Sequence, residues 1–493
     1  MKPRTIALLA GPALFLLMAL LPAPAGMSET AKIAAAITLW VAVWWIAEPI
    51  DLAVTSLLPL VLFPLTGLPM SAISGEYGNE LIFLFISGFF FGKTIERWRL
   101  HRRIALRLIT LFGNDPKRTV LGFMVATAFI SMWISNTATA VMMTPVAIAV
   151  AQNSKSSHPN FSKNLLLGVG YACSIGGLGT VIGTPTNGIF LAYVQQHMGQ
   201  NVSFFQWLLF GAPFAAALLL VCWVLLMFLF PIPATKDGAL QDTIRLELRA
   251  LGPLTTPEKL LLLIFGAVIF AWISGSIWWY TPLNEWIHQH FAANPSGKMP
   301  RYINDTLIAL TGALSLFLVP AFDRKPVGDD YNTLLDWKHA VQIPWGIVLF
   351  FGGGLALAKG FEQSGLAQWM GAQMEGLAVL PQALLLCAVL AVVVLLSEIA
   401  SNVATASMLM PILAALAASV GMHPFGLLIS AAMAATFGFG LPIATPPNTI
   451  VYSAGFFSTR EMARAGFLLD LIAILLLVGF IYAFMPLVWG FAI

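Results

Sequence analysis

Long apolar stretches with few charged residues inside them are the feature of this sequence that most restricts its fold. They occupy residues 6–21, 31–49, 51–68, 79–113, 119–150, 164–196, 207–231, 257–278, 303–321, 341–375, 381–419, 423–456 and 462–491. Only 10% of the 493 residues are charged, against roughly 25% in soluble domains, so a soluble fold would lack polar surface. Because about 20 apolar residues cross a bilayer as a helix, we expect an all-α polytopic membrane protein.

The same composition argues against several classes of function. A net charge of +3 gives no basic surface for a nucleic acid. The cysteines Cys173, Cys222 and Cys387 lie in apolar stretches without a Cys or His partner at metal-ligand spacing, which is typical of core residues. No HExxH or GxSxG motif and no nucleophile–base pair occurs, so we expect neither an enzyme nor an organic cofactor.

The N-terminal region and the basic residues together predict the orientation. Residues 1–25 resemble a cleavable signal, but the many apolar stretches that follow favour an uncleaved N-terminal helix. Eight of the 25 basic residues fall in one short region, at Lys93, Arg97, Arg99, Arg102, Arg103, Arg107, Lys117 and Arg118. By the positive-inside rule this region is cytoplasmic, which puts the N-terminus inside and the C-terminus outside. The alternative, an anion site made of these side chains, is the less favoured reading.

Two segments of the chain repeat each other. Residues 131–150 (SMWISNTATAVMMTPVAIAV) and 397–416 (SEIASNVATASMLMPILAAL) share nine of twenty positions. Each is followed by a second shared segment, IGTPTNGIF at 182–190 and IATPPNTIV at 443–451. Two paired segments in the same order indicate an internal duplication.

The duplication predicts an inverted repeat. Five expected crossings separate the two Ser-Asn segments, and an odd number places them on opposite sides of the membrane. Secondary transporters have this arrangement, with broken helices that meet near the midplane. The chain is then divided into an N-terminal helix, a first repeat, a cytoplasmic connection and a second repeat, at residues 1–30, 31–231, 232–256 and 257–493.

The repeated motifs combine residues that interrupt helices. Ser-Asn is a good turn and N-cap, so we expect re-entrant hairpins over 119–150 and 381–419 with these residues at the tips. The Thr-Pro motifs predict unwound points in helices 164–196 and 423–456. Such breaks offer carbonyl, hydroxyl and amide oxygens to a hard monovalent cation, and helix N-termini to an anion. The simpler alternative is that Ser, Asn and Pro merely cap and kink packed helices.

With these motifs the sequence resembles the divalent anion/sodium symporter family, which includes bacterial and animal carriers of dicarboxylates, citrate and sulfate. The family's paired Ser-Asn-Thr motif is present as Ser135-Asn136-Thr137 and, altered, as Ser401-Asn402-Val403. The resemblance covers nearly the whole chain. It implies an elevator-type homodimer of about 11 transmembrane helices plus two hairpins per protomer, in the plasma membrane (a bacterial inner membrane).

The resemblance also implies two sodium sites and an anion site between them. The sodium ligands would be Ser131, Ser135, Asn136 and Gly183 in one site, and Ser397, Ala400, Asn402 and Ala444 in the other. The small dianionic carboxylate would be bound by Asn136, Thr137, Thr184, Pro185, Asn402, Val403, Thr445 and Pro446.

Val403 departs from the family pattern because it has no hydroxyl where the motif has threonine. The hydrogen bond that is lost is worth roughly 1.5–3 kcal/mol when it goes to a charged group. Thr405 is a candidate replacement. The leading hypothesis is sodium-coupled import of a C4-dicarboxylate such as succinate, malate or fumarate. A sodium-independent dicarboxylate exchanger and a citrate or sulfate carrier remain open, whereas a membrane enzyme or a channel is disfavoured.

Overall fold

The protein is helical throughout the part of the chain that the computed structural model describes, residues 3–113, 115–153, 158–233, 238–292, 299–322 and 332–490. In these ranges the β pairing consists of one isolated bridge between Pro320 and Thr333. The helices up to residue 229 are α1 Pro3–Leu20, α2 Glu29–Ala47, α3 Leu52–Thr55, α4 Leu58–Leu62, η1 Phe63–Thr66, α5 Met70–Ser74, η2 Gly75–Gly78, α6 Glu80–Arg97, α7 Leu100–Thr110, α8 Pro116–Ser131, α9 Asn136–Asn153, α10 Pro159–Gly177, α11 Pro185–Met198 and α12 Phe204–Leu229.

The helices of the remaining chain follow in the same manner. They are α13 Gly238–Ala250, α14 Thr256–Ser274, η3 Gly275–Trp279, α15 Tyr280–Phe291, α16 Asp305–Leu318, α17 Trp337–Ala340, α18 Trp345–Ser364, α19 Leu366–Met374, η4 Glu375–Val379, α20 Gln382–Ile399, α21 Asn402–Ser419, α22 Pro424–Ala434, α23 Pro446–Ser453 and α24 Thr459–Trp489.

Seven of the described helices are long and apolar enough to cross a membrane. They are Glu29–Ala47, Phe204–Leu229, Thr256–Phe291, Trp345–Ser364, Gln382–Ile399, Asn402–Ser419 and Thr459–Trp489. Shorter apolar helices include Arg4–Leu20 and Asp305–Leu318. The expected all-α polytopic architecture is thus confirmed, whereas the count of about 11 crossings stays a prediction.

Local sequence explains where several long helices begin. Ser203 and Gln206 form a capping box at the start of α12, in which each side chain bonds the backbone N–H of the other. Ser458 and Glu461 form the same box at the start of α24. These bonds satisfy backbone donors that would otherwise be unpaired at a helix start.

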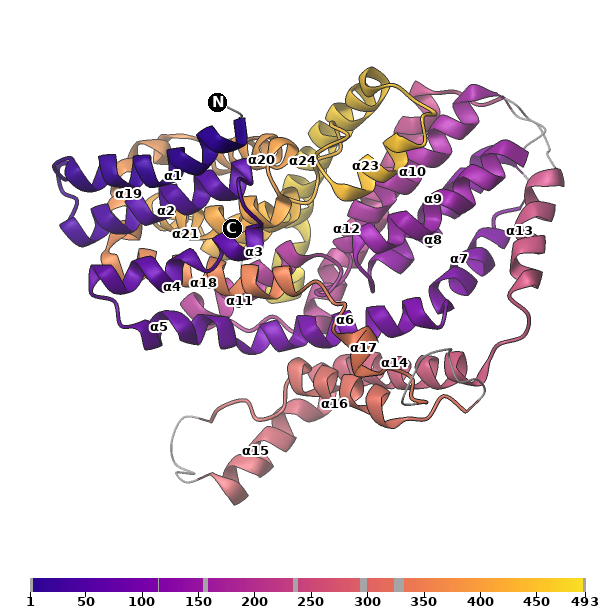
Figure 1. Ribbon diagram of the computed structural model, residues 1–493, viewed down its shortest axis with the longest axis horizontal. Coiled ribbons are helices and arrows are strands. Elements are labelled where there is room, and N and C mark those ends of the chain that lie inside the picture. Colours follow the sequence, from indigo (N-terminus) through magenta and orange to yellow (C-terminus); the bar gives the residue numbers. More distant parts are fainter. Residues whose placement is uncertain are drawn as a thin grey trace.

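Each repeat contains a helical hairpin and a broken helix, and the two broken helices lie side by side. The hairpins are α8–α9 and α20–α21, which turn at residues 132–135 and 400–401. The broken helices are α10–α11, interrupted at 178–184, and α22–α23, interrupted at 435–445. Helix α10 packs on α23 (Figure 1). Helix α11 packs on α22, so the two broken helices run antiparallel.

The two interruptions meet inside the molecule. The hydroxyl groups of Thr186 and Thr436 are hydrogen-bonded at 2.8 Å, and both side chains are fully buried. Thr186 belongs to the first turn of α11, and Thr436 is the second residue after the end of α22. The contact joins the broken helix of one repeat to that of the other.

Two glycines of helix α6 face the first hairpin and the first unwound segment. A Cβ atom placed on Gly88 would be 3.4 Å from Ile182, and one on Gly92 would be 3.4 Å from Ile134. At these two positions α6 presents only its backbone, so the side chains of Ile182 and Ile134 lie close to it, as is common where small residues allow close packing.

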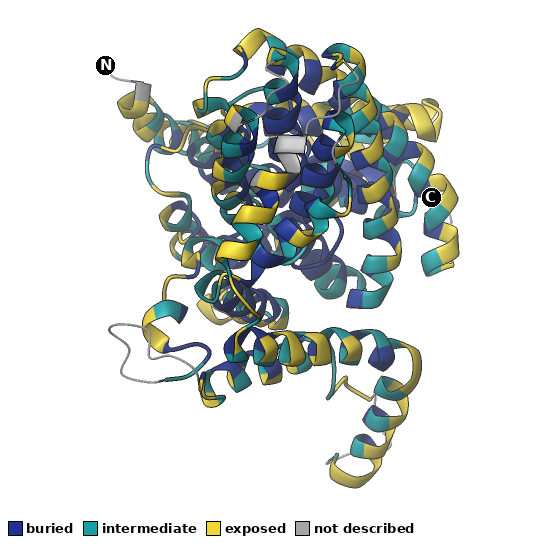
Figure 2. Ribbon diagram, turned by 90° about the vertical axis from the view of Figure 1, so that its right-hand side faces the viewer, coloured by how far each residue is buried: buried dark blue, intermediate teal, exposed yellow. Residues whose placement is uncertain are grey.

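Buried residues are concentrated in the body of the molecule, and α14–α16 lie along one edge of it (Figures 1 and 2). This edge carries exposed apolar side chains, including Leu263 and Phe270 on α14 and Leu318 on α16, which are 69%, 67% and 78% exposed. An exposed apolar face of this kind suits contact with lipid or with another protein.

Candidate functional site

Three oxygen atoms lie together at the first hairpin tip, and one of them is the hydroxyl oxygen of Ser131. This oxygen lies 2.8 Å from Asn136 Oδ1 and 2.7 Å from the carbonyl oxygen of Cys173. Because a hydroxyl has one proton, it can donate to only one of these two acceptors. Ser131 is fully buried. The acceptor that does not receive the hydroxyl proton therefore faces the Ser131 oxygen with no proton between them, and a cation there would separate the two oxygens. This oxygen set fits a sodium ion.

The unwound segment between α10 and α11 lies against this cluster. A Cβ atom on Gly177 would be 2.7 Å from Asn136 Oδ1 and 3.2 Å from the carbonyl oxygen of Gly183, so only glycine fits there. Asn187 holds the segment, because its Nδ2 donates to the carbonyls of Gly177 and Thr180 at 3.0 and 2.8 Å. Ser131, Asn136 and Gly183 are therefore brought together.

The second repeat reproduces the arrangement. Ser397 Oγ lies 2.8 Å from Asn402 Oδ1 and 2.5 Å from the carbonyl oxygen of Ala435. Asn448 Nδ2 holds the unwound segment through the carbonyl of Gly438, at 2.9 Å. The same bonds thus recur at equivalent positions, and the oxygen cluster is present twice.

The other expected sodium ligands lie at the edges of these clusters. Ala444 ends the second unwound segment beside Gly438, where a Cβ atom would lie 3.5 Å from the side chain of Ala444 and 3.6 Å from the carbonyl oxygen of Ser397. Ala400 lies at the tip between α20 and α21. Ser135 Oγ accepts a hydrogen bond from the backbone N–H of Ala138 at 3.2 Å, so its hydroxyl also caps α9.

A cavity of 710 Å³ opens beside the first hairpin tip, and Ser135 and Thr137 line it. Both residues are exposed, and Asn136 between them is half-buried. The other wall is formed by helix α6, the turn that follows and the start of α7, with the ionisable residues Lys93, Glu96, Arg99, His101 and Arg102. We call this side of the molecule the basic end. None of the expected anion-binding residues of the second repeat lines this cavity.

Charge in this cavity is predominantly positive. Lys93 is paired with Glu96 at 2.8 Å, and Arg102 is paired with Glu247 of α13. Burial lowers the pKa of His101 on the amphipathic helix α7, which favours the neutral form of the ring. Arg99, in a left-handed backbone conformation with φ 54°, is exposed.

The Thr-Pro motifs begin the second half of each broken helix. Thr184 and Thr445 are extended N-cap residues, and Pro185 and Pro446 are the first helical residues. Proline suits this position because its missing N–H would be unpaired there in any case. The helix starts direct positive dipole ends at the two breaks, which favours an anion nearby.

Val403 lies on the half-buried face of α21, one residue after Asn402. Thr405 is fully buried. Two residues turn a helix by about 200°, so its hydroxyl points to the opposite side of α21. This spacing does not favour Thr405 as the replacement for the hydroxyl that Val403 lacks, and that replacement stays a prediction from the sequence.

Sequence reasoning missed the role of Asn187 and Asn448. Both are fully buried, and each amide nitrogen ties two carbonyls of its unwound segment. The signal was available, because this asparagine is one of the few polar residues shared by both copies of the Thr-Pro motif.

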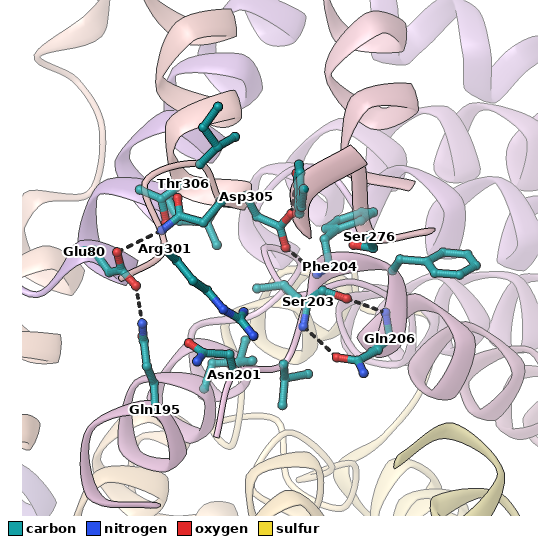
Figure 3. Close-up of a pocket in the computed structure, with 18 of the residues that line it drawn as sticks. Glu80, Gln195, Asn201, Ser203, Phe204, Gln206, Ser276, Arg301, Asp305 and Thr306 are labelled. Carbon is teal, nitrogen blue, oxygen red and sulfur yellow. Dashed lines mark hydrogen bonds between the residues drawn. The ribbon is translucent and has the colours of Figure 1, made fainter. Parts of the chain in front are cut away.

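A second cavity, of 430 Å³, lies at the opposite end of α6 from Arg97 and contains none of the expected site residues (Figure 3). Glu80 there accepts hydrogen bonds from Asn304, at 2.9 Å, and from Gln195 at the end of α11. Asp305 accepts from the backbone N–H of Phe204 at 2.6 Å. These bonds join α6 and α16 to the first broken helix and to α12.

The crossing helices and the paired broken helices define an all-α polytopic membrane protein. The chain belongs to the family described as "Sodium:sulfate symporter transmembrane region", whose model matches residues 2–490. It is 38% identical to the sodium-dependent dicarboxylate transporter SdcS of Staphylococcus saprophyticus over 496 residues, which cover 98% of this chain and 92% of the relative. It is 39% identical to SdcS of Staphylococcus aureus (strain MRSA252) over 498 residues, with the same coverage.

Two solved structures share the fold at low sequence identity. The Neisseria gonorrhoeae efflux pump MtrF matches with a TM-score of 0.54 at 13% identity, covering 97% of this chain and 94% of that one. The YdaH transporter of Alcanivorax borkumensis matches with a TM-score of 0.55 at 12% identity, covering 86% of this chain and 89% of that one. At this identity the likeness concerns the fold alone.

Proposed function

We propose that the protein is a secondary active transporter that imports C4-dicarboxylates, such as succinate, malate or fumarate, together with sodium. The observation that carries this proposal is the twofold oxygen cluster, Ser131 with Asn136 and Ser397 with Asn402. The printed names of the SdcS relatives, which describe sodium-dependent dicarboxylate transport, support the same substrate and ion.

In this proposal each repeat supplies one sodium site. Ser131, Ser135, Asn136 and the carbonyl of Gly183 hold one ion, and Ser397, Asn402 and the carbonyls of Ala400 and Ala444 hold the other. Neutral oxygen ligands of this type suit a hard cation. The dicarboxylate lies between the tips, against the side chains of Asn136, Thr137 and Asn402 and the helix starts at Thr184-Pro185 and Thr445-Pro446. Since no Lys or Arg belongs to these motifs, sodium compensates the negative charge of the substrate.

The proposal extends to the whole transporter. The N-terminus lies in the cytoplasm and the C-terminus outside, because the basic end follows the positive-inside rule. Two protomers form a homodimer, and in each a transport domain with both hairpins and broken helices moves relative to a scaffold domain. The inverted repeats support alternating access of this kind. A dimer interface has exposed apolar surface available on α14 and α16.

A second candidate within the same family is a carrier of a different anion, citrate or sulfate, or an exchanger of dicarboxylates that needs no sodium. The specific observation in its favour is Val403, which removes one hydroxyl from the second tip. The word sulfate in the family's description points the same way.

The test is uptake of labelled succinate into proteoliposomes with an inward sodium gradient, compared with potassium or choline. We expect uptake only with sodium, and a further increase with an inside-negative potential if more sodium charge than substrate charge enters. Asn136→Ala and Asn402→Ala should each abolish uptake, whereas Asn201→Ala, an exposed asparagine in the second cavity, should leave it unchanged. Full uptake in both site variants, or uptake that needs internal dicarboxylate but no sodium, would refute sodium symport.

A further inference from the structure

Glu398 links the second hairpin to the second unwound segment. Its carboxylate is buried, and its two oxygens accept hydrogen bonds from the backbone N–H groups of Gly440 and Leu441, at 2.5 and 2.8 Å. Both donors lie in the break between α22 and α23, where no helical carbonyl is available to them. The carboxylate therefore takes the place of a missing helical turn.

The first repeat makes the equivalent connection with different chemistry. The duplication aligns Met132 with Glu398 and Thr180 with Leu441. In the first repeat the hydroxyl of Thr180 donates to the backbone carbonyl of Met132 at 2.5 Å. The same two positions thus join hairpin and unwound segment in both repeats, and the donor lies on the unwound segment each time. What is exchanged is the origin of the groups: the side chain comes from the unwound segment in the first repeat and from the hairpin in the second. An exchange that preserves the connection indicates that the connection itself is needed.

The second unwound segment is held on both sides of its backbone. Its N–H groups are bonded by Glu398 and, more weakly, by Asp470 of α24, whose Oδ1 lies 3.4 Å from the N–H of Phe439. Its carbonyls at Gly438 and Leu441 are bonded by Asn448 Nδ2. The segment's path to Ala444 is consequently fixed by side chains rather than by helical hydrogen bonds.

We propose that Glu398 is a positioning residue for the second sodium site. It does not bind the ion: it fixes the backbone that ends at Ala444, and it directly follows Ser397, whose hydroxyl belongs to the oxygen cluster. Loss of its two hydrogen bonds lets the segment move and spreads the ligands of that site. The identity of the ion rests on the function proposed above.

The test uses the purified full-length protein and measures its unfolding temperature as sodium replaces choline at constant ionic strength, without dicarboxylate. We expect sodium to raise this temperature, and the half-effect concentration to be about tenfold higher in Glu398→Gln, which retains one acceptor oxygen, because hydrogen bonds to charged groups contribute at least this much. Glu398→Asp, which keeps the charge but is shorter, should show a similar increase. Glu375→Gln removes the same charge at an exposed position and should match the wild type.

The outcomes separate positioning from other roles and from the proposed substrate. Half-effect concentrations within twofold of the wild type in both Glu398 variants would overturn the inference, as would a wild type that sodium does not stabilise. Normal behaviour of Glu398→Asp alone would also overturn it, since charge rather than reach would then matter. Sodium stabilisation that weakens in both variants, in a protein that takes up no succinate, would support the inference and refute only the proposed substrate.

Discussion

At the scale of single residues, the repeated serine and asparagine residues of the two hairpins were the most informative part of the sequence. Ser131 with Asn136 and Ser397 with Asn402 lie within hydrogen-bond distance of each other, in a turn that both sequence copies predict. The asymmetric residues were harder to interpret. Glu398 is aligned with Met132, which has no carboxylate, so the repeat pattern could not indicate what the carboxylate contacts. Only the path of residues 435–445 places their N–H groups at its carboxylate.

Val403 gives a prediction at this scale. Val403→Thr changes the shape of the side chain little and adds a hydroxyl at the second hairpin tip. We expect the KM for succinate to fall by about tenfold at saturating sodium, because a hydrogen bond to a charged group contributes roughly 1.5–3 kcal/mol. The measurement is concentration-dependent uptake in proteoliposomes.

The matched control is Val420→Thr, a half-buried valine that follows the other end of α21. It should leave the KM unchanged. A KM for Val403→Thr equal to that of the wild type would mean that the substrate does not reach this part of the tip.

At the scale of elements, hydrophobic pattern and helix-breaking residues predicted helices better than they predicted connections. Helix breaks near Gly183 and Ala444 follow from glycine and proline in the sequence. The stretch 79–113 instead contains two helices, α6 and α7, separated at Trp98 and Arg99. Sequence alone could not show this turn, because Arg99 adopts a left-handed conformation that its residue type does not favour.

The connection between α7 and α14 gives a prediction for stability. Arg103 forms a buried ion pair with Glu258 at 2.7 Å and also bonds the carbonyls of Leu251, Gly252 and Pro253. In Glu258→Gln the capping role of this residue at the start of α14 is kept, but the buried arginine loses its counter-charge. We expect a loss of about 3 kcal/mol in the free energy of unfolding.

Thermal unfolding of the detergent-purified protein would measure this loss. The control is Lys359→Gln, which breaks a more exposed pair with Glu362 and should cost less than about 1 kcal/mol. Equal unfolding temperatures for Glu258→Gln and the wild type would show that the carbonyls alone satisfy Arg103.

At the scale of the whole molecule, the two ends of α6 differ in the access that they give to the first hairpin tip. At the basic end, Ser135 and Thr137 line an open cavity. At the opposite end, hydrogen bonds from Gln195 to Glu80 and from Gln196 to Glu76 join the end of α11 to the region around α6. The structure thus represents a state in which the first hairpin tip is reached from the basic end.

This asymmetry predicts one-sided labelling. In a chain without its three native cysteines, Thr137→Cys should react with a membrane-impermeant maleimide added on the basic side, and at least about tenfold more slowly from the other side. The physical reason is that a charged reagent needs an aqueous path. Labelling is measured on proteoliposomes of known orientation.

Asn201→Cys provides the matched control, since it lines the second cavity and is exposed. It should show the reverse preference. Equal labelling of Thr137→Cys from both sides would contradict a closed opposite end. The orientation of the repeats relative to the membrane stays a prediction from the sequence, whereas the state of opening could not be predicted from it, because that state depends on side-chain contacts between distant elements.

The glycine face of α6 has a mechanical consequence. At Gly88 and Gly92 helix α6 has no side chain of its own, so the side chains of Ile182 and Ile134 lie close to its backbone, whereas Phe85 of the same helix packs tightly on Gly188 of α11. We therefore expect the first hairpin tip to shift past Gly88 and Gly92 more easily than α11 can shift past Phe85, whose ring would have to leave its position against Gly188. In the alternating access proposed above, the hydrogen bonds of Gln195 with Glu80 and of Gln196 with Glu76 would have to break together with this contact, so we expect substitutions at Glu76 and Glu80 to change the rate of transport.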